Sequence, residues 1–124
     1  MQNDHSKTPI IQLSIEFSLM VIRYAEQLEA NSKHVIANQV LKNGTAIGAY
    51  IMEAQSAESN IQYFEKLHAA DRKAHNTWYW IYLCDQAAGY GVDKDLVKKL
   101  ERIMESLHTL ILSGKKPSSP VPLQ

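Results

Sequence analysis

Apolar residues recur at intervals of three and four positions along most of this chain, which is the spacing that places side chains on one face of an α-helix. Short polar or glycine-containing breaks divide the pattern into four segments. The pattern predicts helices over residues 9–31, 33–57, 60–88 and 94–113. No segment alternates apolar and polar residues as a β-strand would. Four helices with short connections predict an all-α, antiparallel up-down four-helix bundle over residues 9–114.

The two ends of the chain lie outside the predicted bundle. Residues 1–8 lack the helical pattern, and we expect a flexible N-terminus there. Thr8-Pro9 suits a helix start, with Thr as the N-cap and Pro in the first turn. Gly114 ends the last predicted helix. Residues 115–124, rich in Pro and Ser, are predicted to be a disordered tail.

The stretch LKNGTAIGAY, residues 41–50, contains a turn signal inside the second predicted helix. Asn43-Gly44 is a strong hairpin dipeptide, yet the apolar residues on both sides keep helical spacing. Gly44 and Gly48 are four residues apart and therefore share one face of the helix. Missing side chains allow another helix backbone to approach closely. We therefore expect a helix-packing motif at this point, with Gly48→Leu destabilising the fold or the assembly. The motif consists of Gly44, Thr45, Ile47, Gly48 and Ala49.

Two of the predicted helices carry more apolar surface than a four-helix core requires. On the first helix, a second apolar stripe is turned away from the stripe that contains Phe17. On the third helix, we place Trp78, Ile81 and Tyr82 with the core, and further apolar residues lie on the opposite side. Contiguous exposed apolar patches usually mark interfaces, so we expect the protein to form a homo-oligomer. The predicted interface residues are Ile11, Ile15, Leu19, Ile22, Tyr79, Trp80, Leu83 and Cys84.

Charge and cysteine content narrow the possible partners. Thirteen basic residues balance thirteen acidic ones, which argues against tight nucleic-acid binding by the monomer. Candidate nucleic-acid contacts are confined to Lys94, Lys98, Lys99 and Arg102. The single cysteine fits a reducing compartment, and no apolar leader or membrane span is visible. We therefore expect a cytoplasmic protein without membrane association, cofactor or small-molecule substrate.

Two Glu-x-x-His motifs, Glu65 to His68 and Glu105 to His108, raise the alternative of a carboxylate-bridged di-metal bundle. Further carboxylates are available on the first two helices, at Glu16, Glu26, Glu29, Glu53 and Glu58. At 100° per residue, however, Glu65 and Glu105 point away from the apolar stripes of their own helices. Because ligands of a buried site must face the core, the spacing favours a solvated surface and no metal site.

A second alternative is an enzyme that uses Arg102 and His108. An Arg followed by a His on a late helix resembles the motif of HEPN-type ribonucleases, which are also small helical bundles. The His could act as general base on a ribose 2′-hydroxyl while the Arg held the phosphate. Ile103 replaces the polar residue that usually stands beside the Arg. Two residue types at a permissive spacing form a weak motif, so we predict no catalytic residues.

The segments NGTAIGAYIMEAQSAES and FEKLHAADRKAHNTWYWIYL resemble the four-helix-bundle family of 23S rRNA intervening-sequence proteins over roughly residues 10–113. The residues that match are Gly44, Thr45, Ile47, Gly48, Ala49, Glu53, Ala54, Phe64, Leu67, Ala70, Ala74, Thr77, Tyr79 and Trp80. The residues that depart from the family pattern, mostly by replacing polar groups, are Ala46, Tyr50, Met52, Asn76 and Trp78.

The resemblance implies an up-down bundle that assembles as a ring-like homopentamer and has no established catalytic activity. A related protein, the accessory variability determinant of diversity-generating retroelements, shares this bundle and binds a reverse transcriptase and nucleic acid. We therefore expect a non-catalytic bacterial adaptor or scaffold whose partners are its own copies and either RNA or a nucleic-acid-processing protein.

Overall fold

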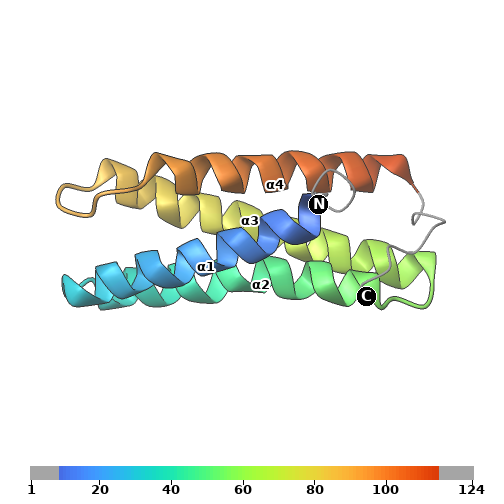
Figure 1. Ribbon diagram of the computed structural model, residues 1–124, viewed down its shortest axis with the longest axis horizontal. Helices are drawn as coiled ribbons and strands as arrows, with labels where there is room; N and C mark the ends of the chain where they lie inside the picture. Colours follow the sequence, from blue (N-terminus) through green and yellow to red (C-terminus); the bar gives the residue numbers. More distant parts are fainter. Residues whose placement is uncertain (1–8, 115–124) are drawn as a thin grey trace, which may run out of the picture.

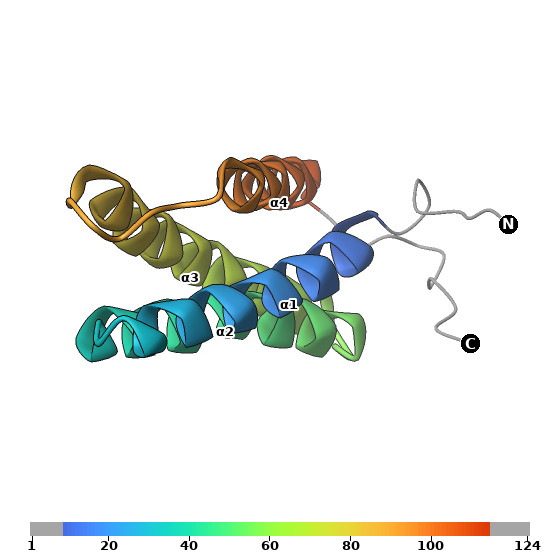
Figure 2. The same cartoon turned by 60° about the vertical axis from the view of Figure 1, so that its left-hand side comes forward.

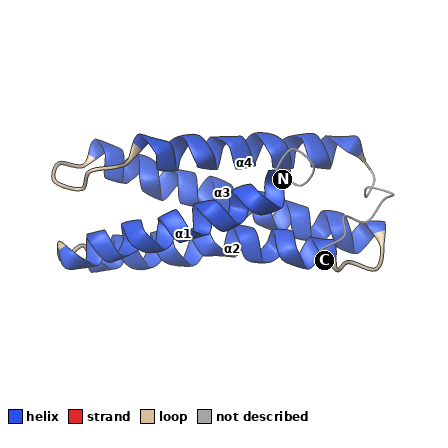
Figure 3. Ribbon diagram, viewed as in Figure 1, coloured by secondary structure: helices blue, strands red, loops and turns tan. Residues whose placement is uncertain are grey.

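The computed structural model describes residues 9–114, and within them four α-helices account for all regular structure. They are α1 (Pro9–Ala30), α2 (His34–Gln55), α3 (Asn60–Gln86) and α4 (Lys94–Ser113), joined by short loops (Figures 1 and 3). The predicted set of four helices, without strands in the described range, is confirmed. The predictions for residues 1–8 and 115–124 lie outside the described residues.

The helix ends differ from the predicted ones by a residue or two because local hydrogen bonds fix them. After α1, the Ser32 amide donates to the Glu29 carbonyl at 2.9 Å and the Lys33 amide donates to Leu28 at 2.8 Å. This pair of bonds is a Schellman motif, in which the residue after the helix is left-handed. That residue is Ser32, with φ of 64°. The motif ends α1 at Ala30.

Side-chain caps set the starts of the last two helices. Ser59 accepts a hydrogen bond from the Gln62 amide at 3.1 Å at the start of α3. Asp93 accepts one from the Asp95 amide at 2.9 Å at the start of α4. Each cap satisfies an amide that the helix itself leaves without a partner. Gly114, in the left-handed conformation, closes α4.

Successive helices run in opposite directions, as Figure 1 shows. Each helix packs on the next along the chain, and α4 closes the bundle against α1. The α2–α3 and α1–α2 interfaces are the most extensive, whereas α4 makes the smallest contacts with its neighbours. In Figure 2, α4 is seen nearly end-on, on the opposite side of the bundle from α2. The helix α2 therefore packs extensively on both α1 and α3, and α4 lies along one side of the bundle with smaller contacts.

One hydrophobic core runs through the bundle. Every helix contributes fully buried side chains at helical spacing, for example Phe17, Ile47, Leu67 and Leu100. The buried stripe of α4 is narrow and consists of Leu96, Leu100, Ile103 and Leu107. None of the four described helices is both long enough and apolar enough to cross a lipid bilayer.

Candidate functional site

Gly44 and Gly48 lie inside α2 where α1 crosses it. A β-carbon at Gly44 would lie 2.8 and 2.9 Å from the two γ-methyl carbons of Val21. A β-carbon at Gly48 would lie 3.3 Å from Ser18 Oγ and 3.5 Å from Ser14 Oγ. The helix whose approach the glycine spacing predicts is therefore α1. The contact at Gly44 is the closer one, and its neighbour Val21 is fully buried.

The other residues of the packing motif divide between core and surface. Ile47 is fully buried. Thr45 is half-buried, and its hydroxyl donates to the Leu41 carbonyl at 2.7 Å within α2. Ala49 is exposed. The motif thus supplies both the close helix contact and part of an outer surface.

That outer surface is an apolar groove between α1 and α2, with a volume of about 210 Å³. Its residues are Ser14, Ile15, Ser18, Leu19, Gly48, Ala49 and Met52. Ile15 and Leu19 are 46% and 51% exposed, which is high for large apolar side chains. Ile22 on α1 and Leu41 on α2 are also exposed. We call these nine residues the α1–α2 groove. Sequence reasoning identified the α1 stripe but missed Leu41 and Met52.

Two of the predicted interface residues belong to the core of the bundle. Ile11 is 8% exposed and Cys84 is 2% exposed, and both lie in the main hydrophobic cluster. At the start of α1 the buried face is wide, so that Ile10, Leu13 and Ser14 are buried together with Ile11. Both residues are therefore unavailable to a partner, and their assignment to an interface is wrong.

The error at Cys84 follows from the orientation of α3. The buried stripe of this helix includes the small residues Ala70, Ala74 and Thr77 and continues to Ile81 and Cys84. Small side chains allow α3 to pack closely on its neighbours, so they form the core stripe in place of the larger aromatics. The aromatics that we placed with the core lie beside this stripe: Trp78 is half-buried and Tyr82 is exposed.

The remaining α3 residues of the predicted interface form an outer aromatic surface. Tyr79 is 54% exposed, and Trp80 and Leu83 are half-buried. The rings of Tyr79 and Trp80 meet edge to face, with centroids 5.8 Å apart and planes at 64°. We call these three residues the α3 outer surface. No lysine or arginine lies between Tyr79 and Leu83, so this surface lacks the charge that accompanies base stacking in nucleic-acid sites.

Cys84 shares its buried environment with Tyr24. The Tyr24 hydroxyl has no hydrogen bond of ordinary geometry within the described residues, although the Cys84 thiol lies beside it. Burial raises the pKa of Tyr24 far above its usual range, and the neighbouring Cys84, Asp85 and Tyr90 add to the effect. Burial also raises the pKa of Cys84, partly offset by Tyr24. Both groups are therefore held in their protonated forms, which makes Cys84 a poor nucleophile.

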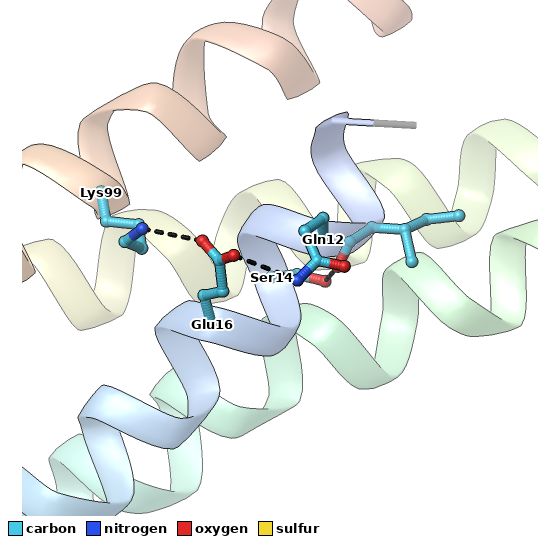
Figure 4. Close-up of polar contacts among 5 residues, drawn as sticks. Gln12, Ser14, Glu16 and Lys99 are labelled. Atoms are coloured by element: carbon cyan, nitrogen blue, oxygen red, sulfur yellow. Dashed lines mark hydrogen bonds and ion pairs between the residues drawn. The ribbon is translucent and has the colours of Figure 1, made fainter. Parts of the chain in front are cut away.

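One of the four candidate nucleic-acid contacts is already engaged within the bundle. Lys99 Nζ lies 2.9 Å from Glu16 Oε1, in an ion pair between α4 and α1 (Figure 4). The Lys99 side chain is only 22% exposed. Gln12 donates to the other oxygen of Glu16 at 3.0 Å. Lys99 therefore serves helix packing, while Lys94, Lys98 and Arg102 are exposed.

The structure does not bring Arg102 and His108 together as a ribonuclease site would require. Both side chains are exposed on α4. At roughly 100° per residue, the spacing from Arg102 to His108 places the two side chains about 120° apart around the helix axis. A general base and a phosphate-binding group must converge on one substrate. This pair does not converge.

The residues of the two Glu-x-x-His motifs lie outside the core. Glu65 and His68 are exposed and line an open hollow on the outer side of α3, and Glu105 and His108 are exposed on α4. Glu53 pairs with Lys66 at 2.8 Å and Glu29 with His34 at 2.5 Å. The other carboxylates, Glu26 and Glu58, are exposed, and Glu16 pairs with Lys99. Among residues 9–114, no three His, Cys, Asp or Glu side chains gather as a metal site would require.

These features define an up-down four-helix-bundle protein that carries exposed apolar faces on α1, α2 and α3. The chain belongs to the 23S rRNA-intervening sequence protein family, whose model matches residues 6–113. The recognition of this family from the glycine and aromatic segments is thereby confirmed.

A solved structure is similar to the chain over nearly its whole described length. It is a protein with unknown function from the S23 ribosomal protein family of Bacteroides thetaiotaomicron VPI-5482. The two share 28% sequence identity with a TM-score of 0.78, over 82% of this chain and 97% of the other. No protein of curated function matches the sequence. The comparisons thus establish family and fold.

Proposed function

We propose that this protein is a non-catalytic scaffold of the bacterial cytoplasm that assembles with its own copies, as a pentamer, and acts as an adaptor for RNA or for a nucleic-acid-processing protein. The observation that carries the proposal is the α1–α2 groove. Its exposed Ile15, Leu19 and Ile22 repeat on one face of α1, and Met52 continues the apolar surface onto α2. Removing apolar area from water is favourable by roughly 25 cal/mol for each Å², and the part of this gain that exceeds the entropy lost on association stabilises the assembly.

The arrangement of the exposed faces suits a ring. The α1–α2 groove is concave, and the α3 outer surface bears the exposed Tyr79 ring. The two surfaces lie on different helices and differ in shape, as head-to-tail contacts between copies require. A head-to-tail contact that closes after five copies gives a pentamer. In the proposed ring, the α3 outer surface of one copy fills the α1–α2 groove of the next.

The assembly can be tested by measuring molar mass with light scattering on a size-exclusion column. The wild-type protein should elute with about five times its monomer mass of 14.0 kDa. Leu19→Glu introduces a charge into the groove and should reduce the mass. Val35→Glu is the matched control, because Val35 is also an exposed apolar residue but does not line the groove. A monomeric wild type at micromolar concentration, or equal effects of the two substitutions, would overturn the proposal.

The adaptor role concerns the exposed polar surface of the assembled protein. Lys94, Lys98 and Arg102 are exposed on α4, but acidic residues at Glu101 and Glu105 share that helix. Ring formation would repeat these three basic residues once per copy. RNA binding should then fall steeply with added salt, and Lys98→Glu with Arg102→Glu should weaken it. Absence of RNA binding at low ionic strength would assign the adaptor role to a protein client.

A further inference from the structure

A small cavity on the seam between α3 and α4 has a lining unlike that of the α1–α2 groove. Its volume is about 70 Å³, enough for the tip of a side chain, since a water molecule occupies about 30 Å³ in the liquid. Ile81 and Leu100 are its buried residues. The other residues that line it are Trp78, Tyr82 and Asp85 from α3 and Val97 and Glu101 from α4.

The aromatic wall of this cavity is a stacked pair. Trp78 and Tyr82 are one turn apart on α3, with ring centroids 5.1 Å apart and planes only 11° from parallel. Trp78 is half-buried, and Tyr82 is 46% exposed. The two rings therefore form a stacked surface, part of which is open to solvent. An open aromatic surface attracts cations through the negative face of the ring.

Carboxylates come from both sides of the seam. Asp85 lies on α3 and Glu101 on α4, and both are exposed. Within the described part of the chain neither carboxylate forms an ion pair, and no Lys or Arg lines the cavity. The site is therefore negative, whereas a phosphate-binding site is positive. This charge excludes nucleic acid as the favoured occupant and selects a cationic group.

We propose that this aromatic–carboxylate cavity binds an arginine side chain of a partner protein. A guanidinium group is planar, so it stacks on an aromatic face while its N–H groups donate to carboxylates. A lysine ammonium is more strongly hydrated and has no plane to stack. The client of the proposed adaptor would then be a protein with an exposed arginine. This biological role rests on the proposed adaptor function. It does not depend on self-assembly.

The test uses the indole N–H signals of the intact protein in a ¹⁵N–¹H spectrum, with the capped tripeptide acetyl-Gly-Arg-Gly-amide as the probe. The chain has two Trp residues, so Trp80→Phe assigns the signals. The Arg peptide should shift the Trp78 signal in a saturable way. The matching citrulline peptide, which keeps the shape but lacks the charge, and the matching lysine peptide should bind at least tenfold more weakly.

Substitutions in the protein complete the test. Asp85→Asn combined with Glu101→Gln should weaken binding of the Arg peptide at least tenfold, whereas Glu105→Gln, an exposed carboxylate on α4 outside the cavity, should leave it unchanged. Equal binding of the Arg and citrulline peptides, a shift confined to Trp80, or no effect of the double substitution would overturn the inference. A change in molar mass with the double substitution would also overturn it, because the cavity would then be a self-interface. Binding that persists in Leu19→Glu separates this site from the proposed assembly.

Discussion

The β-carbon position of Gly44 on α2 lies 2.8 Å from Cγ1 of Val21 on α1. Val21 is fully buried and β-branched, so it has little freedom to move away. Gly44→Ala should therefore push the two helices apart and lower the free energy of unfolding by about 1–3 kcal/mol, as overpacking generally does. Urea denaturation followed by circular dichroism measures this change.

Gly48→Ala provides the matched comparison on the same helix. Its β-carbon would meet Ser18 Oγ at 3.3 Å, a contact that a small shift of one hydroxyl relieves. Alanine is favoured over glycine inside a helix by about 1 kcal/mol. We expect Gly48→Ala to be neutral or slightly stabilising. If the two alanine variants unfold at the same urea concentration, the close contact at Gly44 does not limit the fold.

The ion pair between Glu16 and Lys99 should couple α1 to α4. In a double-mutant cycle of Glu16→Gln and Lys99→Met, we expect a coupling energy of up to about 1 kcal/mol, because the pair remains partly open to water. The coupling should decrease at high salt. Lys98→Met is the control, since Lys98 is exposed on the same helix. An equal coupling of Glu16 to Lys98 would show that only the overall charge of α4 matters.

The left-handed backbone at Ser32 predicts a stabilising substitution. Its φ is 64°, a conformation that costs a residue with a β-carbon roughly 1–2 kcal/mol. Ser32→Gly removes this strain, but the greater freedom of glycine in the unfolded chain offsets part of the benefit. We expect the free energy of unfolding to rise by about 0.5–1 kcal/mol. Ser56, at the end of α2, has φ of −94°. Ser56→Gly should bring no gain, and thermal melting of the two variants decides the point.

Stability should fall in alkaline solution because Tyr24 and Cys84 keep their protons in the folded state. Their ordinary pKa values are 10.0 and 9.0, and burial raises both in the native protein. Above about pH 9 the unfolded chain releases these protons while the folded chain holds them, so each further rise in pH favours unfolding. The stabilisation is fully present below pH 9 and declines above it. Urea midpoints between pH 7 and pH 11 measure the decline.

Tyr24→Phe isolates the contribution of the buried hydroxyl. The variant should lose less stability than the wild type between pH 9 and pH 11, and at pH 7 it should be about as stable, since the hydroxyl has no well-formed hydrogen bond to lose. Tyr79→Phe serves as the control because Tyr79 is exposed. Parallel pH profiles for the wild type and Tyr24→Phe would contradict the assignment.

The helical spacing predicted the number and approximate bounds of the helices because each helix buries a regular stripe. It was most accurate for α4, where the stripe of Leu96, Leu100, Ile103 and Leu107 is narrow and flanked by charge. It was only partly right for α3, where the small Thr77 lies in the core and the larger Trp78, which we placed there, lies beside it. Side-chain size is a poor guide where helices approach closely, because close approach requires small residues.

The apolar groove could be predicted only in part. Ile15, Leu19 and Ile22 form a visible stripe along α1. Met52 contributes because Gly48 leaves space beside it where α1 crosses α2, and that crossing depends on the packing of whole helices. The aromatic–carboxylate cavity was missed for the same reason. Its two carboxylates, Asp85 and Glu101, are separated in sequence and lie on helices that only the fold brings together.

The unequal packing of the helices also affects the order in which they pack while the protein is being synthesised. The extensive α1–α2 and α2–α3 interfaces can form once residues up to Gln86 have left the ribosome, before α4 has emerged. Until α4 has emerged and packed, the apolar surface of the first three helices that later receives Leu100 and Ile103 remains exposed. Any helix with the same narrow stripe can occupy that surface during this interval, including α4 of a neighbouring nascent chain. We therefore expect misassembly of this protein to occur mainly by exchange of α4 between copies.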